Sequence, residues 1–354
     1  MMPDQKSEKA FLDVETSSLS QRWVERLGPL GRNTALAISQ RLDVPELLGR
    51  VLAARGVALE DAESFLAPAI RDLMPDPDTL TDMRRATDRL VAAINAQEKV
   101  AIFGDYDVDG ACSAALLFRF LSAYGLAPRI HIPDRIFEGY GPNIPAIQEL
   151  VEGGATLIVT VDCGATSHEA LAEAKALGVD VIVLDHHQMG EDLPPCDALV
   201  NPNRQDDLSG LEYLCAAGVV FMTMVSVLRA LRGHGAGSQA IKPPDLREWL
   251  DLVALATVCD VVPLKGLNRA FVVTGLQVMA LQKNTGLKAL SGLARLDGPP
   301  RPYHLGFVLG PRINAGGRIG DAALGARLLT TSDDLEAFEI SQTLDSLNKE
   351  RQQA

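Results

Sequence analysis

The sequence has none of the features that mark a membrane-spanning, secreted or disulfide-stabilised protein. Its longest apolar stretch, residues 214–228, is shorter than the roughly 20 residues that a membrane span requires, so we expect a buried helix there. The N-terminal residues contain no apolar signal-peptide segment, which favours a cytoplasmic protein. The five cysteines form no Cys-x-x-Cys pair, which argues against a disulfide framework or a thiolate zinc site and predicts small buried residues.

Basic residues are also scarce. The chain has 33 Lys and Arg residues against 46 Asp and Glu residues, which gives a net charge of −13. This balance speaks against a generally basic nucleic-acid coat or a polybasic membrane surface, although it is compatible with a local basic site. The 354 residues, of which 47% are hydrophobic, are typical of a globular protein with two or three domains.

The pattern of apolar residues changes along the chain and predicts an α/β protein. Residues 1–95 have helical periodicity, and residues 266–354 are again rich in helical patterns. In residues 96–265, short β-rich runs alternate with helical segments, which is typical of a parallel sheet wrapped by helices. We therefore predict a doubly wound parallel sheet flanked by helices, with a helical N-terminal region and a helical C-terminal extension. The expected strands are 100–103, 129–132, 156–161, 179–184 and 197–200, and the first helix of the sheet region is expected at 113–124.

Acidic residues and histidines gather where these apolar runs end. The side chains concerned are Asp105, Asp107, Asp109, Asp162, Asp185, His186, His187 and, after a further apolar run, Asp260. Ligands of an open α/β sheet bind in the crevice outside the carboxyl ends of its strands, so these motifs can share one crevice. Taken singly, such an Asp is often a turn former or a helix cap, and a His-His pair is often structural. Independent caps need not all follow strands, so the joint pattern favours one site.

A cluster of carboxylates is costly unless a cation lies among them. Oxygen ligands with one or two imidazoles favour Mg²⁺ or Mn²⁺, and Mn²⁺ is the better match once histidine is included. Two such ions would activate a water and stabilise the leaving oxygen of a phosphoryl displacement. The residues alone therefore favour phosphoryl hydrolysis.

The motifs resemble a known family. GDYDVDG, VTVDCG, DHH and CDVVPL, in this order, resemble the successive motifs of the DHH phosphoesterase superfamily, and within it those of the bacterial RecJ-type single-strand-specific exonucleases. FLAP at 65–68, EGYG at 138–141 and GPRINAGGR at 310–318 extend the resemblance over nearly the whole chain. Superfamily members with histidine in the first motif differ from this sequence.

The resemblance implies a two-metal centre and a reaction. It implies Mn²⁺ or Mg²⁺ ligands at Asp107, Asp109, Asp162, His186 and Asp260, with Asp162 as the bridge and Asp105 as a less certain ligand. His187 would contact the scissile phosphate or assist proton transfer to the leaving group. The expected activity is 5′-to-3′ hydrolysis of single-stranded DNA to 5′-mononucleotides, in repair and recombination.

Contacts to the strand are expected from side chains and loops outside the metal motifs. The candidates are Arg135, Arg312, Asn314, Gly317 and Arg318. For Arg312 the alternative is an intramolecular salt bridge that holds its loop. For Tyr106 and Tyr140 we favour packing over base stacking.

Two other functions stay open at this point. One is a DHH phosphoesterase that cleaves oligoribonucleotides or pAp-like nucleotides, and the other is an inactive scaffold that binds DNA. By resemblance, single-strand-binding protein and a RecQ-type helicase are expected partners, and no membrane is expected. RecJ-type enzymes continue into a DHH-associated domain and an oligonucleotide-binding fold, so we interpret these 354 residues either as the catalytic portion of a longer enzyme or as a natural short form with weakened or altered activity.

Overall fold

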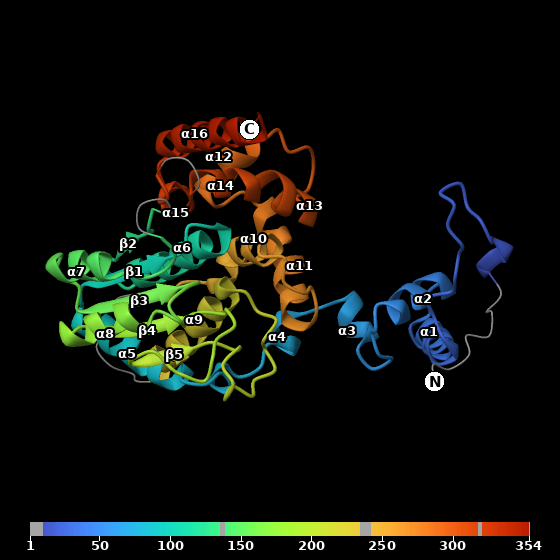
Figure 1. Ribbon diagram of the computed structural model, residues 1–354, viewed down its shortest axis with the longest axis horizontal. Helices are drawn as coiled ribbons and strands as arrows, with labels where there is room; N and C mark the ends of the chain where they lie inside the picture. Colours follow the sequence, from blue (N-terminus) through green and yellow to red (C-terminus); the bar gives the residue numbers. More distant parts are fainter. Residues whose placement is uncertain (1–9, 135–138, 234–241, 318–320, 354) are drawn as a thin grey trace. The chain divides into compact units, whose positions relative to one another are not determined.

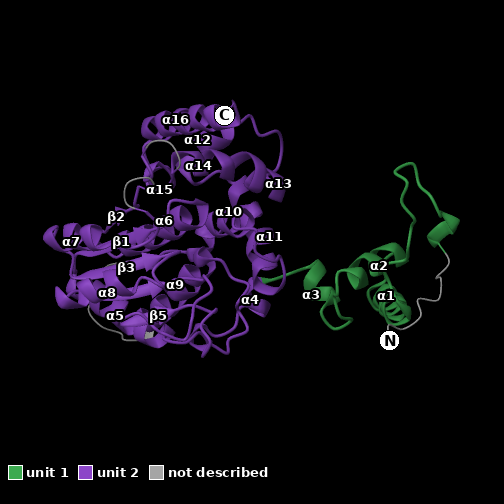
Figure 2. Cartoon of the chain, viewed as in Figure 1, with its two compact units in different colours: residues 1–69 green, residues 70–354 purple. Residues whose placement is uncertain are grey.

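The computed structural model describes residues 10–134, 139–233, 242–317 and 321–353 of the chain (Figure 1). Its packing divides the chain into two compact units, Met1–Ala69 and Ile70–Ala354 (Figure 2). Helix α5 (Met83–Ala96) belongs to the second unit because it packs on strand β5 (Ala198–Val200) and helix α9 (Ala216–Gly233), whereas the sequence pattern alone groups it with the N-terminal helices.

The first unit is a small helical assembly. Its helical elements are η1 (Phe11–Asp13), α1 (Pro29–Leu42), α2 (Glu46–Ala54) and α3 (Ala62–Leu66). Helices α1 and α2 pack closely because Gly49 has no side chain: a Cβ atom there would lie 2.3 Å from the carbonyl oxygen of Ala35. Ile38 and Leu52 are fully buried between these helices.

The second unit is built on a five-stranded parallel sheet in the order β2-β1-β3-β4-β5. The strands are β1 (Val100–Gly104), β2 (Arg129–His131), β3 (Leu157–Val161), β4 (Asp180–Leu184) and β5 (Ala198–Val200). These strands confirm the predicted α/β class. Alternate residues of the central strands face opposite cores: Ile102 and Val159 pack toward α5, α6 and α9, while Phe103 and Ile158 pack toward α7 and α8.

Helices cover both faces of this sheet and form a further layer beyond it. In chain order they are α4 (Ile70–Leu73), α5 (Met83–Ala96), α6 (Val108–Ala123), α7 (Ile144–Glu152), α8 (His168–Ala176), α9 (Ala216–Gly233), α10 (Leu250–Cys259), α11 (Gly266–Ala280), α12 (Thr285–Leu293), α13 (Pro302–His304), the π-helix η4 (Leu305–Leu309), α14 (Gly310–Gly316), α15 (Leu324–Thr330) and α16 (Asp334–Gln353). Two short 3₁₀ turns are η2 (Pro77–Thr79) and η3 (Leu246–Trp249). Figure 1 shows α12 to α16 gathered on one side of the sheet.

The strand order places a topological switch point between β1 and β3. The chain steps from β1 to β2 on one side and returns to β3 on the other, so the loops that leave β1 and β3 diverge. Open parallel sheets bind ligands in the crevice at this point. The crevice therefore lies where Asp105 and Asp162 follow their strands. Among the described residues, no helix is long and apolar enough to cross a membrane.

Candidate metal centre

The first motif forms the tight connection between β1 and α6. Helix α6 begins at Val108, five residues earlier than the sequence pattern predicts, because the Asp107 side chain caps it by accepting a hydrogen bond from the Gly110 backbone N–H at 3.0 Å. Gly110 is required at the bend: a Cβ atom there would lie 2.4 Å from the Asp105 carbonyl oxygen. The Asp105 carboxylate accepts a bond from the Tyr106 N–H at 2.7 Å, and burial followed by the charge of Asp107 raises the pKa of Asp105 to about 7.

Asp109 lies in the first turn of α6 and faces the N-terminus of α9. Its two oxygens accept hydrogen bonds from the backbone N–H groups of Ala216 at 2.6 Å and Ala217 at 2.8 Å. These groups and the positive end of the α9 dipole stabilise the carboxylate. Burial nevertheless raises the pKa of Asp109, and the charge of His186 only partly opposes this.

Asp162 is buried and Asp260 half-buried, and both have carboxylate oxygens without a hydrogen-bond donor among the described residues. Both oxygens of Asp162, and Oδ2 of Asp260, accept no hydrogen bond from any described residue. Asp162 follows β3 with a positive φ of 61°, which turns its side chain into the crevice. Burial and the charge of Asp109 raise the pKa of Asp162 well above its usual value, and burial with the charges of Asp109 and Asp107 raises that of Asp260 to about 8.

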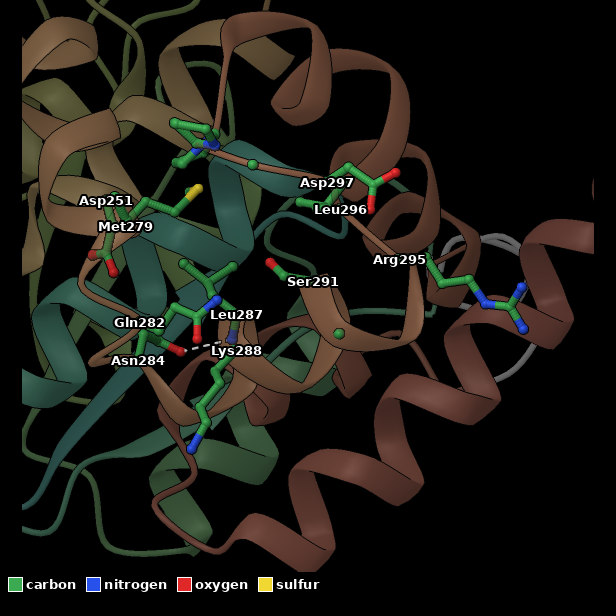
Figure 3. A pocket seen from close by; sticks show the side chains of 15 residues that line it. Asp251, Met279, Gln282, Asn284, Leu287, Lys288, Ser291, Arg295, Leu296 and Asp297 are labelled. Atoms are coloured by element: carbon green, nitrogen blue, oxygen red, sulfur yellow. Dashed lines mark hydrogen bonds between the residues drawn. The ribbon is translucent and has the colours of Figure 1, made fainter.

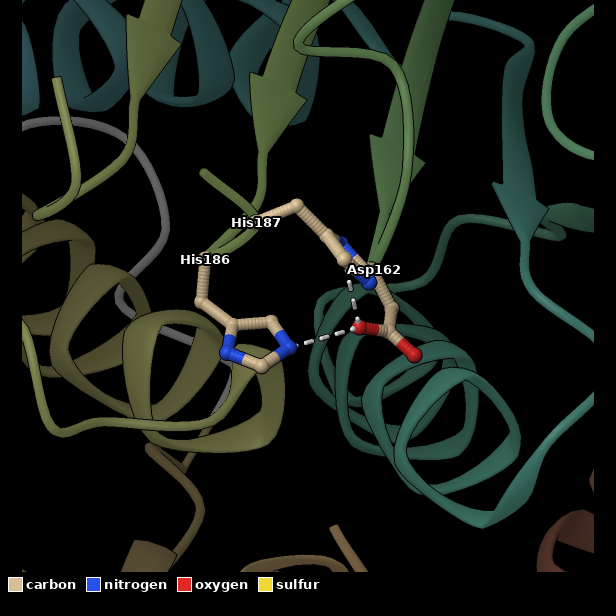
Figure 4. A group of neighbouring side chains, drawn as sticks. All are labelled: Asp162, His186 and His187. Carbon is tan, nitrogen blue, oxygen red and sulfur yellow. Dashed lines mark ion pairs between the residues drawn. The ribbon is translucent and has the colours of Figure 1, made fainter. Parts of the chain in front are cut away.

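Three of these carboxylates lie within 4 Å of one imidazole nitrogen. Nε2 of His186 lies 3.3 Å from Asp162 Oδ1, and Figure 4 shows this pair at the end of the sheet. The same nitrogen lies 3.6 Å from Asp260 Oδ2 and 3.7 Å from Asp109 Oδ2. Asp109 lies in α6, and the other three side chains follow β3, β4 and α10, so the fold brings together residues about 150 positions apart.

The donor set fits a pair of divalent cations. Three groups of residues each offer ligand atoms within 4.8 Å of one another: Asp162 with His186 and His187, Asp109 with His186 and Asp260, and Asp105 with Asp107 and Asp162. Asp162 takes part in two of the groups, as a bridging ligand would. Buried carboxylate oxygens without hydrogen-bond donors and with raised pKa values are what hard cations such as Mg²⁺ and Mn²⁺ bind best.

His187 is held by Asp185, which the sequence places in the acidic cluster but to which it assigns no role in the metal centre. Its Nδ1 lies 2.7 Å from Oδ1 of Asp185, and this hydrogen bond raises the pKa of His187 to about 9. Burial alone would raise the pKa of Asp185, but the bond and charge of His187, together with backbone N–H groups including that of Ala165, lower it. Asp185 follows β4 directly, which is the sequence signal that could have identified it.

Two asparagines after β5 fix the backbone of the histidine pair. Asn201 Nδ2 donates to the carbonyl of His187 at 2.9 Å, and Asn203 Nδ2 donates to the carbonyl of His186 at 2.5 Å. Asn201 is fully buried. The Asn-Pro-Asn sequence that ends the fifth strand was the available signal for this role.

The residues predicted to contact the DNA strand differ in what surrounds them. Arg312 is paired: its Nε donates to Asp345 of α16 at 2.9 Å, and it also donates to the carbonyl of Val308 at 2.7 Å, so the alternative of a loop-holding salt bridge applies. Gly317 lies against the first motif, since a Cβ atom there would be 2.6 Å from the Tyr106 carbonyl oxygen. Asn314 Oδ1 is buried without a partner among the described residues. Arg135 and Arg318 lie outside the described residues.

Tyr140 and two cysteines differ from their sequence-based predictions. Tyr140 is 53% exposed rather than packed in the core, and its hydroxyl lies 3.4 Å from Nε2 of His187. Tyr106, in contrast, packs against the core as predicted. Cys196 and Cys259 are half-buried, whereas the other three cysteines are fully buried as expected.

A cavity elsewhere in the unit contains none of these residues. Its volume is about 410 Å³, and Figure 3 shows its lining from the end of α11 through α12 and the following loop, including Gln282, Lys288 and Asp297. The buried carboxylate of Asp251 lies at its edge. Because no predicted metal ligand lines it, this cavity is separate from the metal centre.

Comparison with known proteins gives a consistent result. The DHH family, N-terminal domain, matches residues 99–257. The single-stranded-DNA-specific exonuclease RecJ of Bacillus subtilis is 38% identical over 319 residues, which make up 89% of this chain and 38% of that protein. The chain therefore spans well under half the length of this relative.

Solved structures agree. A crystal structure of exonuclease RecJ bound to manganese is 36% identical and matches 79% of this chain and 68% of that chain with a TM-score of 0.69. RecJ from Thermus thermophilus in complex with Mn²⁺ is 32% identical and matches 92% of this chain and 45% of that chain with a TM-score of 0.77. The Thermus protein is also known in complex with Mg²⁺, with a TM-score of 0.67 at 29% identity over 92% of this chain and 42% of that chain.

Proposed function

This chain belongs to the DHH family, in its RecJ branch, and from that premise we propose that it is the catalytic portion of a metal-dependent 5′-to-3′ exonuclease specific for single-stranded DNA. The chain spans only part of its relatives, so its activity, substrate and partners are all part of this proposal. The observation that carries it is the cluster around His186 Nε2. Two buried carboxylates and the half-buried Asp260 approach this nitrogen, and the oxygens of one of them, Asp162, have no donor among the described residues.

The proposed ligands form two overlapping sets. Asp105, Asp107 and Asp162 would hold one Mn²⁺ or Mg²⁺ ion, and Asp109, His186 and Asp260 would hold the second. Asp162 would be shared between the ions, because its Oδ1 lies 3.3 Å from Nε2 of His186 in the second set. When bound, such a pair of cations supplies an activated water and neutralises the charge that develops on the phosphate. The α9 backbone groups that hold Asp109 keep its oxygens oriented toward His186.

His187 supplies the proton chemistry in this proposal. The water oxygen joins the phosphorus while the bond from phosphorus to the 3′-oxygen of the terminal nucleotide breaks, so that oxygen must gain a proton. Asp185 orients the His187 ring through Nδ1 and favours its protonated form, which leaves Nε2 available to donate to the 3′-oxygen or to the scissile phosphate. The products are a 5′-mononucleotide and a strand with a new 5′-phosphate.

The proposal also covers the residues that contact the DNA strand and the partners that provide it. Arg135, Asn314, Gly317 and Arg318 remain our candidates for phosphate contacts, whereas the Asp345 pair occupies Arg312. We also propose single-strand-binding protein and a RecQ-type helicase as the partners that provide single strands, and the cytoplasm as the site of action.

Hydrolysis assays test the proposal directly. The chain is incubated with Mn²⁺ and with 5′-phosphorylated single-stranded DNA, the matching duplex, or ribonucleotides two and three residues long, each internally labelled. We expect 5′-mononucleotides from the single strand, none after chelation by EDTA, and little from the duplex. A preference for the short ribonucleotides would instead support the oligoribonucleotide phosphoesterase. Absence of any hydrolysis, together with unchanged behaviour of Asp162→Asn, would support the inactive scaffold.

A further inference from the structure

Two aromatic side chains stack on each other at the surface of the second unit. The rings of Tyr303 and Phe307 lie 5.2 Å apart with an angle of 21° between their planes, and their side chains are 63% and 72% exposed. By contrast, Phe103, Phe120 and Phe271 of the same unit are completely buried. Leaving two large apolar rings in water forgoes the free energy of burial, which indicates a surface that binds something.

The positions of Tyr303 and Phe307 on their helices place both rings on the solvent-exposed side. Tyr303 lies in α13 and Phe307 in the π-helix η4, four residues apart and therefore on one face. Leu305 and Leu309, between and beyond them, are fully buried and anchor the segment. The pair is consequently fixed in position by the core beneath it and does not depend on a loose loop.

The segment that carries the pair packs next to the metal centre. Cys259 Sγ donates to the carbonyl of Leu305 at 3.4 Å, and Gly306 lies against Val258, so η4 contacts the last turn of α10. The next residue of the chain is Asp260, one of the proposed ligands. The segment that carries the aromatic pair is therefore packed on the helix that ends beside a proposed ligand.

A second exposed aromatic side chain adjoins a different residue of the centre. Tyr140 contacts His187 edge-on, with ring centroids 6.0 Å apart. Thus one exposed aromatic ring contacts His187, and the segment that carries the other two packs on the helix that ends beside Asp260. A strand that crosses the centre has nucleotides beyond the scissile phosphate, and these need a support.

We infer that Tyr303 and Phe307 form a stacking platform for a base of the single strand that lies beyond the nucleotide being removed. The inference rests on the proposed function. Aromatic faces stack on every base, so the platform holds a strand of any sequence. Arg301, two residues before Tyr303, is exposed and forms no ion pair with the described residues, so its charge complements the backbone phosphates.

Binding measurements in EDTA test the platform without any hydrolysis. A 5′-phosphorylated, fluorescently labelled 12-nucleotide DNA is titrated with the chain, and single abasic sites are then placed at each successive position. We expect Tyr303→Ala/Phe307→Ala to weaken binding of the intact strand about 5- to 150-fold, the range for loss of one base–aromatic stack. One abasic position should weaken binding to the unmodified chain by a similar factor and cause no further loss in the double variant.

Matched variants separate stacking from folding. Tyr303→Phe keeps the ring and should keep the affinity, whereas Phe338→Ala removes an exposed aromatic side chain of α16, 47% exposed, and should have no effect on binding. Circular dichroism should show an unchanged melting temperature for the double variant.

Three results would overturn the platform: unchanged affinity of the double variant for the intact strand, an equal loss on every abasic strand, or a change in oligomeric state with unchanged affinity, which would indicate a second copy of the chain as the occupant. Position-specific loss in EDTA without hydrolysis in Mn²⁺ would leave the platform standing and reject the proposed activity. Hydrolysis by a double variant with normal affinity would support the proposed activity and reject the platform.

Discussion

Asp162 and Asp185 follow adjacent strands of the same sheet and are equally buried, each 1% exposed, yet their environments are opposite. Asp185 accepts hydrogen bonds from three backbone N–H groups and from the His187 ring, and its pKa is lowered. Asp162 accepts none from the described residues, and its pKa is raised well above the usual value. Burial acts in the same direction on both, so the difference comes from the donors and the His187 charge around Asp185 and from the neighbouring carboxylates, Asp109 first, around Asp162.

The contrast shows how one sheet edge supports two tasks. A carboxylate that the protein already satisfies can orient an imidazole, whereas one left without donors has its lone pairs available for a cation. Leaving Asp162 unsatisfied costs stability in the metal-free chain, and a bound cation offsets that cost. The fold therefore keeps a destabilised carboxylate beside a stabilised one.

Replacing Asp162 should have the largest effect. It should remove the unsatisfied buried carboxylate that distinguishes Asp162 from Asp185. Asp162→Asn should lower hydrolysis about a thousandfold or more, because several kcal/mol of metal-dependent stabilisation are lost. The metal-free variant should melt at a higher temperature than the unmodified chain, since the neutral amide removes a buried charge. Asparagine tolerates the positive φ of 61° at this position.

Melting in EDTA across pH sharpens this test. A folded-state pKa raised above the unfolded value, as at Asp260 with about 8 and Asp105 with about 7, gives stability that is complete below about pH 4 and is lost as the pH rises through those values. The metal-free chain should therefore melt lower at pH 8 than at pH 6, and Mn²⁺ should remove most of that difference. Full activity of Asp162→Asn, or no Mn²⁺ effect on melting of the unmodified chain, would contradict the assignment.

Replacing Asp185 should have the next largest effect and should act through His187. Asp185→Asn should lower hydrolysis about a hundredfold, the scale of general acid catalysis, and lower the pKa of His187 from about 9 toward its ordinary value. The alkaline limb of the pH–rate profile should move to lower pH. The raised pKa of His187 stabilises the fold below about pH 6.5 and ceases to do so above about pH 9, so the variant should lose this dependence. An unshifted profile would mean that Asp185 serves packing alone.

The smallest effect is expected from breaking the Arg312–Asp345 ion pair, which lies outside the metal centre. Arg312→Ala breaks the half-buried pair with Asp345 and should lower the free energy of unfolding by about 1 kcal/mol, with strand affinity unchanged. Asp345→Asn should cost a comparable amount, and the double variant should cost less than the sum of both. A clear loss of DNA affinity in Arg312→Ala would return Arg312 to the strand-binding set.

Much of the fold could be predicted from local pattern. Five short apolar runs separated by helical segments predict a parallel sheet, and all five strands are present within two residues of the expected bounds. The start of α6 was predicted too late because the acidic segment that contains Asp107 was interpreted as a metal motif, whereas Asp107 is also the N-cap of the helix. The helix 83–96 was grouped with the wrong neighbours because an amphipathic pattern does not identify the partner of its apolar face.

The clustering of the candidate ligands was predictable from the sequence, but which of the carboxylates accept hydrogen bonds was not. Strand-end position singles out Asp105, Asp162 and His186 because carboxyl ends of parallel strands meet at one edge. Tyr140 was expected to pack, yet it lies exposed beside His187. Whether a tyrosine is buried depends on neighbours from distant segments, which no local pattern specifies.

By itself, the sequence determined the family, the kind of ligand and the sheet edge at which the ligands meet, because all three depend on residue types at short spacings. Only the tertiary structure decided which carboxylate is satisfied and which is left available. The donors to Asp185 come from its own turn and from Ala165, whereas those to Asp109 come from α9, more than 100 residues away, and the described residues supply none to Asp162. Hydrogen-bond partners and burial are set by packing, and packing is a property of the folded chain.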